Sequence, residues 1–355
     1  MTGERPRTGP WPSTSIIVPV RAVNEAFLTC LYSLYDLDPA PLEILLVLDG
    51  CSDGVPGPKE GNGNLLVRVI RLPRTGGPAR ARNQGAAGAR GDVLFFLDAD
   101  VEVSPDAVKR IHRVFQENDP PDALFGCYDD EPEKPDLTSR FRNLLHHYTH
   151  LKSHEEASTF WAGCGAVRRD VFLDLGGFDE HYARPSIEDI ELGYRLKRRG
   201  FRIRLVKDLR VKHLKHWGFF QMLRTDLFDR AVPWTRLILR DRRFVNDLNL
   251  RTSNRISVAA MGILTVTAIA ALWVPSLALG AVAALLVLTA LNAPLLRFFL
   301  LKRGWGFMIR TAPLLGVYYL CCGLGFSIGV LQHVACPGRP RLSRTDKTPM
   351  QREAS

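Results

Sequence analysis

The strongest structural signal in the chain is the decapeptide Gly91-Asp-Val-Leu-Phe-Phe-Leu-Asp98-Ala-Asp100. Its five central residues, 93–97, are all apolar, which is typical of a strand buried on both faces of a parallel sheet. Side chains alternate along an extended chain, so Asp98 and Asp100 leave the strand end on the same side. Open α/β sheets bind ligands at the carboxyl ends of their strands. The stretch therefore predicts a ligand site at this edge of a sheet.

The two acids of this stretch repel each other unless a cation lies between them. Hard carboxylate oxygens suit Mg²⁺ or Mn²⁺, and such a metal in turn binds a diphosphate. Asp98 and Asp100 are therefore predicted metal ligands. The alternative is that they only cap a helix that starts near Ser104-Pro105, although a cap needs one acid rather than two.

Strand and helix patterns alternate through the first hundred residues. The predicted strands are 15–20, 42–48, 65–71 and 93–97, and the predicted helices are 24–35 and the small-residue segment 79–89. This alternation indicates an α/β fold with a doubly wound, mostly parallel sheet. Residues 119–139 are acidic and rich in proline, so we expect them to form a loop or flap over the site.

Two further helices carry titratable side chains. In the predicted helix 140–156, His146, His150 and His154 recur every four residues, which suits either a metal site or a polar helix face. The predicted helix 187–199 has acids in its first turn and bases in its last, as the helix dipole favours. Glu188 and Asp189 at its start either face a catalytic cleft or only complement that dipole.

Composition limits the classes of function. The chain has 355 residues and a net charge of +10, with basic residues scattered rather than interleaved with aromatic ones. We therefore exclude nucleic acid as a partner and expect an anionic membrane surface instead. The seven cysteines form no CxxC pair, which indicates reduced thiols in a cytosolic chain. Residues 1–13 lack an apolar core and are expected to be a flexible N-terminus rather than a signal peptide.

The C-terminal part has a different character. Apolar, aromatic and arginine residues share residues 216–250, which predicts amphipathic helices in a membrane interface. Within the region 251–335, three apolar runs, 256–274, 276–296 and 312–335, are each long enough to cross a bilayer. The remaining residues, 336–355, are expected to be a disordered basic tail. These features predict a multi-pass protein of the cell membrane.

Basic residues set the expected topology. Arg251 and Arg255 should lie in the cytoplasm with the catalytic domain, and the first two spans should form a hairpin that turns at Pro275. The third span would then leave the tail on the far side, which the positive-inside rule disfavours. The alternative is a re-entrant third segment that keeps the tail cytoplasmic.

Taken in order, seven motifs between residues 14 and 217 resemble the family-2 type of inverting nucleotide-sugar glycosyltransferases. They are Ile16-Ile-Val-Pro-Val20 with Asn24-Glu25, Asp49-Gly-Cys-Ser-Asp53, Ala81-Arg82-Asn83 with Gly85, Phe96-Leu-Asp98-Ala-Asp100, Gly163-Cys-Gly165 with Arg168-Arg169, Gly176-Gly-Phe178-Asp179, and Glu188-Asp189. The resemblance implies a GT-A fold of the nucleotide-diphospho-sugar transferase type over residues 14–215. It also implies single-sugar transfer with inversion to an acceptor hydroxyl, here of a lipid or membrane-associated molecule.

The resemblance further implies a role for each motif. Asp49 would hold the nucleotide base, and Asp98 and Asp100 would hold Mg²⁺ or Mn²⁺ and the diphosphate, with His213 as a further metal or diphosphate contact. Asp189 would be the catalytic base, with Glu188 as the second candidate. The donor-binding residues implied by the motifs are Pro19, Glu25, Asp49, Asp53, Arg82, Asn83, Asp98 and Gly163.

Two departures from the family pattern bear on function. The first turn, Arg21-Ala22-Val23, is longer than usual, and the signature of processive synthases is incomplete because Thr225 follows Gln221-Met-Leu-Arg224. The second departure favours transfer of one sugar over polymerisation. Two other functions stay open. A nucleotidyltransferase that activates sugars would have a glycine-rich loop after the first strand, and a non-catalytic membrane scaffold would not need Asp49, Asp98, Asp100 and Asp189 together.

Overall fold

The computed structural model describes residues 12–57, 65–242 and 244–335. The predicted tail, 336–355, and residues 1–11 of the predicted flexible N-terminus lie outside these ranges. Ser13 is described, and both its backbone nitrogen and its hydroxyl donate hydrogen bonds to Asp92, at 3.0 and 2.7 Å.

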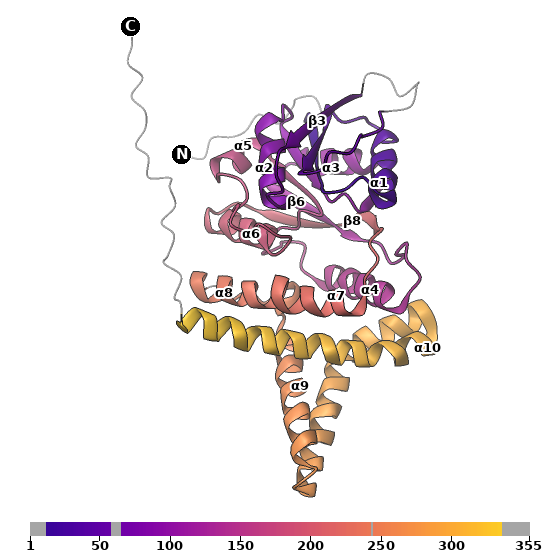
Figure 1. Ribbon diagram of the computed structural model, residues 1–355, viewed down its shortest axis with the longest axis vertical. Helices are drawn as coiled ribbons and strands as arrows, with labels where there is room; N and C mark the ends of the chain where they lie inside the picture. Colours follow the sequence, from indigo (N-terminus) through magenta and orange to yellow (C-terminus); the bar gives the residue numbers. More distant parts are fainter. Residues whose placement is uncertain (1–11, 58–64, 243, 336–355) are drawn as a thin grey trace.

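A mixed sheet with the strand order β3-β2-β1-β4-β7-β6-β8-β5 forms the centre of the N-terminal domain (Figure 1). Its strands are β1 Thr14–Val20, β2 Glu43–Asp49, β3 Leu66–Leu72, β4 Val93–Leu97, β5 Val101–Val103, β6 Ala123–Tyr128, β7 Cys164–Arg168 and β8 Ile203–His213. The first four in this order pair in parallel, as predicted. Strand β7 then runs antiparallel to both β4 and β6, while β8 is parallel to β6. The α/β fold is therefore confirmed, and its second half is mixed.

Helices cover both faces of this sheet. Helix α1 (Glu25–Tyr35) and helix α3 (Ala107–Phe115) pack on one face, while α2 (Pro78–Gly88), α5 (Arg169–Asp174) and α6 (Glu188–Arg198) pack on the other. The small residues of α2 allow close approach, since a Cβ on Gly85 would lie 2.4 Å from the Ile17 side chain. Asn24 precedes α1 as its N-cap and accepts a hydrogen bond from the backbone nitrogen of Phe27.

The prediction of a loop over residues 119–139 is wrong in its centre. Strand β6 (Ala123–Tyr128) occupies it, and all six of its residues are buried between β7 and β8. The strand is short and has acids and prolines on both sides, so its composition resembles a loop. Its neighbour β8 follows about eighty residues later, and only that long-range pairing makes a strand of it. Helix α4 (Leu137–Lys152) ends the segment.

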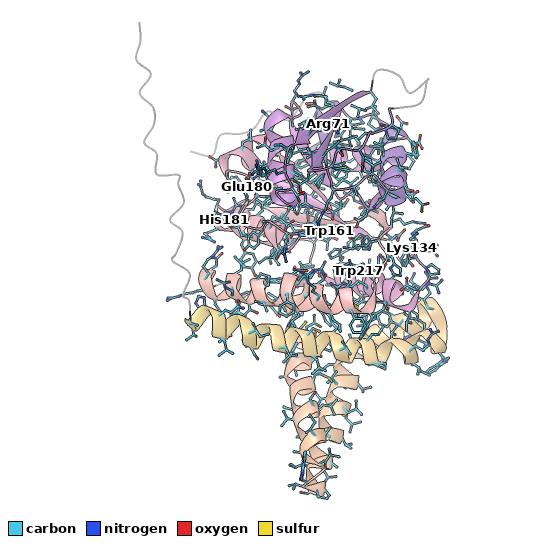
Figure 2. All side chains as sticks on the ribbon, in the orientation of Figure 1. Arg71, Lys134, Trp161, Glu180, His181 and Trp217 are labelled. Atoms are coloured by element: carbon cyan, nitrogen blue, oxygen red, sulfur yellow. The ribbon has the colours of Figure 1, made fainter. Side chains whose placement is uncertain are left out.

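A continuous helical rod lies below the sheet domain (Figure 1). It consists of α7 (Phe219–Arg224), the π-helix η1 (Thr225–Ala231) and α8 (Val232–Asp241). We call residues 219–241 the platform. Figure 2 shows Trp161 and Trp217 between the sheet domain and the platform. A short 3₁₀ turn, η2 (Leu248–Leu250), leads from the platform to the next helix.

The C-terminal helices form a hairpin and a transverse arm (Figure 1). Helix α9 (Thr252–Ala270), the turn η3 (Pro275–Leu277) and the first part of α10 (Ala278–Ala335) project away from the sheet domain. At Gly304 the backbone takes φ = 80°, and α10 changes direction there. The second part of α10, which we call the arm (residues 305–335), lies across the hairpin and alongside the platform. The run 312–335, which we expected as a third span, is part of this arm and does not run parallel to the hairpin (Figure 1).

Close contacts fix the arm and the hairpin to the rest of the protein. A Cβ on Gly325 would lie 2.4 Å from Ala231 of the platform, so glycine is what allows this crossing. Tyr319 donates a hydrogen bond to Asn292 at 2.7 Å, and Asn292 donates to Ser257 of α9 at 3.1 Å. Within the described residues, α9 and the segment from η3 to the end of α10 are long and apolar enough to cross a membrane, by length and composition.

Candidate active site

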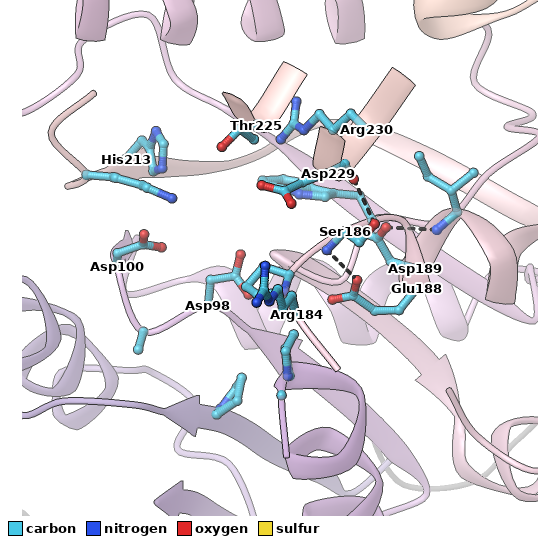
Figure 3. A pocket seen from close by; sticks show the side chains of 18 of the residues that line it. Asp98, Asp100, Arg184, Ser186, Glu188, Asp189, His213, Thr225, Asp229 and Arg230 are labelled. Carbon is cyan, nitrogen blue, oxygen red and sulfur yellow. Dashed lines mark hydrogen bonds between the residues drawn. The ribbon is translucent and has the colours of Figure 1, made fainter. Parts of the chain in front are cut away.

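A cavity of about 1040 Å³ lies between the carboxyl edge of the sheet and the platform. Residues far apart in the sequence line it: Asp49, Arg82, Asp98, Asp100, Glu188, Asp189, His213 and Arg230. Figure 3 shows the acids of the sheet edge facing Thr225, Asp229 and Arg230 of the platform. The strand end that carries the acid pair and the start of α6 thus face one cavity.

Strand pairing holds the acid pair in place. The backbone nitrogen of Asp98 donates to the Gly163 carbonyl at 3.2 Å, and the Asp100 carbonyl accepts from Leu214 at 2.9 Å. His213 pairs in register with Val101, and its ring stacks on Tyr128 with 4.3 Å between centroids. The acid pair and His213 therefore meet at the edge where β4 and β8 end.

The protonation states at this edge suit a divalent cation. Burial, followed by the charge of Asp98, raises the pKa of Asp100 to about 6. Burial lowers the pKa of His213 to about 3, so the imidazole is neutral, the form that binds metals. Among the described residues, no three His, Cys, Asp or Glu side chains form a complete metal cluster. The two carboxylates of Asp98 and Asp100 alone are a donor set that suits Mg²⁺ or Mn²⁺, because such ions commonly take their remaining ligands from water and substrate phosphates.

Arg82 connects the acid pair to helix α6. Its Nη2 lies 2.6 Å from Oδ1 of Asp98, and its Nη1 lies 2.9 Å from Oε1 of Glu188. The other carboxylate oxygen of Glu188 accepts a hydrogen bond from the backbone nitrogen of Ser186 at 2.9 Å. Both oxygens of the buried Glu188 are therefore engaged in hydrogen bonds, one with Arg82 and one with the backbone of Ser186.

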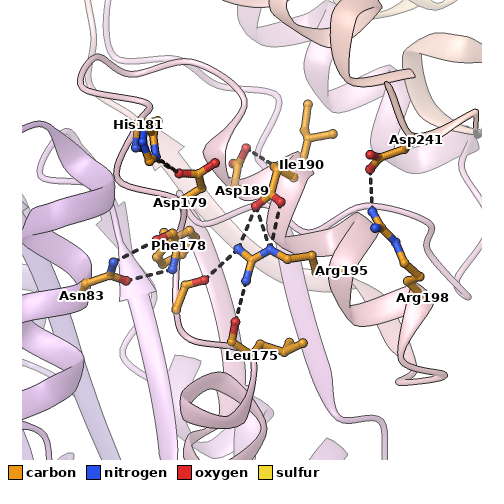
Figure 4. Close-up of polar contacts among 12 residues, drawn as sticks. Asn83, Leu175, Phe178, Asp179, His181, Asp189, Ile190, Arg195, Arg198 and Asp241 are labelled. Atoms are coloured by element: carbon orange, nitrogen blue, oxygen red, sulfur yellow. Dashed lines mark hydrogen bonds and ion pairs between the residues drawn. The ribbon is translucent and has the colours of Figure 1, made fainter. Parts of the chain in front are cut away.

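Asp189 has the environment of a general base. Its oxygens accept hydrogen bonds from the backbone nitrogens of Ala162 at 3.2 Å and Ile190 at 2.8 Å. Burial, followed by the charge of Glu188, raises its pKa to about 7. A carboxylate with this pKa can accept a proton near neutral pH. Helix α6 holds it firmly, since Arg195 pairs with Glu191 and donates to the backbone of the preceding loop (Figure 4).

Four of the eight predicted donor-binding residues line the cavity: Pro19, Asp49, Arg82 and Asp98. Both oxygens of Asp49 accept hydrogen bonds from the backbone nitrogens of Gly76 and Gly77, at 2.7 and 3.0 Å. Asp49 thereby fixes the turn that starts α2, and that turn needs a glycine because Gly77 has φ = 89°.

The other four predicted donor-binding residues, Glu25, Asp53, Asn83 and Gly163, are not among the residues that line the cavity. Asn83 exchanges hydrogen bonds with the backbone of Phe178 at 2.8 and 2.9 Å, which ties α2 to the loop before α6 (Figure 4). Asp53 accepts from Val23 and Cys51 at the surface. Asn83 thus supports a wall of the site from outside, whereas Asp53 contacts only residues of the nearby surface turns.

The histidine row departs from both of its predicted roles. Helix α4 ends at Lys152, so His154 lies beyond the helix. His146 and His150 line the cavity, and burial lowers both pKa values, that of His150 to about 4. His146 Nε2 lies 2.9 Å from Nη1 of Arg230. The side chains of His146 and His150 are therefore neutral and line the cavity. They form neither a metal cluster nor a solvated helix face.

The main residues that the sequence analysis missed come from the platform. Gln221, Arg224, Thr225, Asp229, Arg230 and Trp234 line the cavity. Their arginine and aromatic composition indicated only an interfacial helix. Arg230 lies in the π-helix η1, a rare conformation that is frequently found at functional sites. No residue pattern in the sequence predicts a π-helix.

Comparisons with known proteins agree with this geometry. Residues 15–176 match the model of "Glycosyl transferase family 2", and residues 142–217 match "N-terminal domain of galactosyltransferase". Together the two matches cover residues 15–217, which include the acid pair and Asp189 but not the platform.

Similar curated proteins carry glycosyltransferase names. An uncharacterized glycosyltransferase, YfnE, of Bacillus subtilis is 25% identical over 57% of this chain and 64% of its own length. A pre-mycofactocin glycosyltransferase of Mycobacterium tuberculosis is 28% identical over 59% of this chain and 44% of its own length. The chain thus spans less than two thirds of these relatives.

A solved structure shares the fold over most of the chain. The mannosyltransferase PcManGT from Pyrobaculum calidifontis, solved with GDP-Man and Mn²⁺, superposes with a TM-score of 0.55. The match covers 89% of this chain and 87% of that one at 18% identity, so it shows the fold alone.

Proposed function

We propose that the chain is a glycosyltransferase of family 2, the family whose model residues 15–176 match, and that it moves one sugar from a nucleotide-diphosphate sugar to an acceptor hydroxyl, with inversion. One observation carries the proposal: the acid pair at the end of β4 and Asp189 at the start of α6 line the same cavity. Inversion requires a base on the side of the sugar opposite the leaving group, and two separate carboxylate sites in one cavity are compatible with that arrangement.

On the donor side, Asp98, Asp100 and His213 would hold Mg²⁺ or Mn²⁺. When bound, the ion supplies positive charge to the diphosphate that leaves. Arg82 forms an ion pair with Asp98 at the cavity edge and offsets its charge. Lys215 also lines the cavity and is close enough to Asp100 to act on its charge.

On the acceptor side, Asp189 would take the proton of the attacking hydroxyl. With a pKa of about 7, a large fraction of Asp189 is ionised at neutral pH, and the carboxylate is still a stronger base than an ordinary one. The acceptor oxygen forms the new bond to the anomeric carbon while the bond to the diphosphate oxygen breaks. Thr225 in place of a tryptophan after Gln221-Met-Leu-Arg224 favours a single transfer over polymerisation.

The proposed setting is the cytoplasmic face of a cell membrane, with the acceptor a lipid or a membrane-associated molecule. Large apolar side chains of the hairpin are exposed, among them Ile263, Val266, Ile269, Leu272, Trp273, Leu279, Leu285 and Leu286. Such a contiguous apolar surface is rare on a soluble monomer and is expected in contact with lipid. A soluble core helix would bury these residues.

The decisive test is donor hydrolysis by the purified full-length protein in detergent. A panel of nucleotide-sugars is supplied with Mn²⁺ or Mg²⁺, and release of nucleoside diphosphate is measured with and without EDTA. We expect slow, metal-dependent hydrolysis of one donor, and its loss in Asp100→Asn. Absence of hydrolysis or binding for every nucleotide-sugar would contradict the proposal.

A further inference from the structure

A second cavity, of about 470 Å³, lies beside the active-site cavity and is lined mainly by apolar side chains. We call it the apolar chamber. Its walls come from α4, the platform, α9 and the arm, with Leu145, Ile238, Val258, Tyr318 and Phe326 among its residues. A cavity of this size can hold a small organic group or a length of hydrocarbon chain. The chamber is therefore built where the sheet domain meets the membrane-type helices.

The chamber and the active-site cavity share part of their walls. Five residues line both: His146, Thr149, Arg230, Trp234 and Asn249. At the other end, chamber residues such as Ala259, Phe326 and Ser327 are exposed on α9 and on the arm. A molecule in the chamber would thus lie between the apolar helix surface and the cavity that contains Asp189.

Arg230 stands where the two cavities meet, and its charge lacks a carboxylate partner. Its Nη1 lies 2.9 Å from His146 Nε2, and no acid of the described ranges lies within ion-pair distance of it. The nearby Asp226 pairs instead with Arg142, whose Nη1 donates to it at 2.9 Å. Burial, followed by the charge of Arg142, lowers the pKa of Arg230. The guanidiniums of the buried Arg142 and the half-buried Arg230 thus share one nearby carboxylate, that of Asp226, which leaves a net positive charge in this wall.

We propose that the apolar chamber holds the hydrocarbon chain of the acceptor lipid and that Arg230 binds a phosphate in its head group. The inference rests on the proposed function, because it places the free hydroxyl of that head group at Asp189. A guanidinium suits a phosphate through its fork of donors. The proton of the hydroxyl passes to Asp189, the oxygen bonds to the anomeric carbon, and the nucleoside diphosphate leaves.

The chamber fits a lipid better than a peptide. A bound peptide exposes backbone groups that need hydrogen-bond partners, while the chamber walls are mainly apolar. A hydrocarbon chain needs no such partners and gains from leaving water. Arg230 carries a positive charge where the chamber meets the active-site cavity, while the rest of the chamber is mainly apolar. An anionic lipid has the matching charged head group and apolar chain.

Photo-crosslinking tests chain binding without any need for turnover. The full-length protein in detergent is irradiated with a long-chain alkyl phosphate that carries a diazirine in mid-chain, and the adducts are mapped by mass spectrometry. We expect adducts on Val258, Tyr318 and Phe326, and at least a fivefold loss in Ala259→Trp, which fills the chamber. Ala268→Trp, the same change on an exposed part of α9 outside the chamber, should label like the wild type. Equal labelling of both variants, or adducts only on the hairpin surface, would overturn the proposal.

A second comparison tests the phosphate. Labelling of the wild type by the alkyl phosphate should exceed labelling by the uncharged alcohol of equal length roughly tenfold, and Arg230→Gln should remove that difference. Arg230→Lys should keep part of it, and Arg236→Gln, an exposed arginine of α8 that lines neither cavity, should keep all of it. Thermal unfolding confirms that each variant is folded. Unchanged phosphate preference in Arg230→Gln would refute the assignment.

Three outcomes separate this inference from its premise. If inorganic phosphate at equal concentration competes as well as the alkyl phosphate, or a peptide displaces it from the chamber, the chamber is not a lipid site. If crosslinks map to the chamber but no nucleotide-sugar is hydrolysed, the proposed function fails while lipid binding stands. If a donor is hydrolysed but no crosslink maps to the chamber, the lipid site fails while the proposed function stands.

Discussion

Nη2 of Arg82 lies 2.6 Å from Oδ1 of Asp98, so the first acid of the pair already has a cationic partner in the folded protein. Within the described residues no basic side chain forms an ion pair with the second acid, Asp100, and burial raises the pKa of Asp100 to about 6. The two acids of the motif are therefore not equivalent. A divalent cation would share Asp98 with Arg82 and would supply the main compensation for Asp100.

Replacing Arg82 should destabilise the protein through Glu188. Arg82 and Glu188 are both buried and lie 2.9 Å apart, so Arg82→Met leaves an unpaired buried carboxylate. Breaking such a pair costs about 3–5 kcal/mol. Urea unfolding of Arg82→Met, Glu188→Gln and the double variant measures this coupling, and the double variant should recover much of the loss. Additive effects of the two single changes would show that the pair is not coupled.

Asp100→Asn should abolish metal-dependent donor binding without weakening the fold. Its raised pKa means that the charged form is disfavoured in the folded state, so the neutral amide should match or exceed the wild-type melting temperature above pH 6. Calorimetric titration with donor and Mn²⁺ gives the binding result. Asp208→Asn, an exposed acid on β8, is the control and should bind like the wild type. Unchanged donor affinity in Asp100→Asn would remove Asp100 from the metal site.

The position of the acid pair could be predicted from local sequence, since residues 93–97 form the buried strand β4 as expected. Helix α6 could also be predicted, because the acids of its first turn and the bases of its last turn mark both of its ends. Strand β6 was missed since its strand character depends on pairing with β8, which lies far along the chain. Local sequence signals predicted an element correctly where propensity and burial agree. They failed where the element forms only by pairing with a strand far along the chain.

The contacts of Arg82 and Arg230 in the active-site cavity could not be predicted from local sequence either. Arg82 was identified as a motif residue, but its bridge between Asp98 and Glu188 joins three distant segments. Arg230 belongs to a segment whose composition indicated only an interface. Hydropathy located the apolar run 312–335 but gave no direction for it, because the change of course at Gly304 depends on a single positive φ. Length and composition cannot distinguish a span from an arm that lies across one.

Asp189→Asn should remove transfer and raise stability at neutral pH. The folded-state pKa of Asp189 is about 7, above that of an ordinary carboxyl, so the folded protein binds its proton more tightly than the unfolded chain. Ionisation of Asp189 therefore lowers the free energy of unfolding progressively as pH rises from about 4 to 7. The neutral amide of Asp189→Asn removes that loss. Melting temperatures of the two proteins should converge at pH 4 and diverge by pH 8.

The activity of the wild type should follow the same ionisation. Below pH 7, kcat/KM should fall about tenfold per pH unit as Asp189 becomes protonated, and it should level off above pH 7. Asp189→Asn should lose about 10²–10⁴-fold in transfer while it still binds donor. A variant that turns over at a near wild-type rate would mean that another group is the base.

The contacts of Lys302 determine the expected topology. Lys302 Nζ lies 2.5 Å from Oδ2 of Asp130, and Arg303 donates to the Asp130 carbonyl at 2.9 Å. Asp130 follows β6, so the end of the hairpin returns to the sheet domain. The arm then continues along the platform on that same side (Figure 1). From this geometry we expect two crossings rather than three, with the end of the arm on the catalytic side.

Cysteine labelling in intact cells tests this arrangement, with the labelling of the parent protein as baseline. Ser276→Cys, exposed at the hairpin tip, should react with a membrane-impermeant maleimide from outside. Gln332→Cys, exposed near the end of the arm, should react only after the membrane is permeabilised. Three parallel spans would instead carry Gln332 to the far face, where it would label in intact cells like Ser276. Protection of both positions until permeabilisation would show that the hairpin does not cross, and the apolar surface of α9 would then need a protein partner rather than a bilayer.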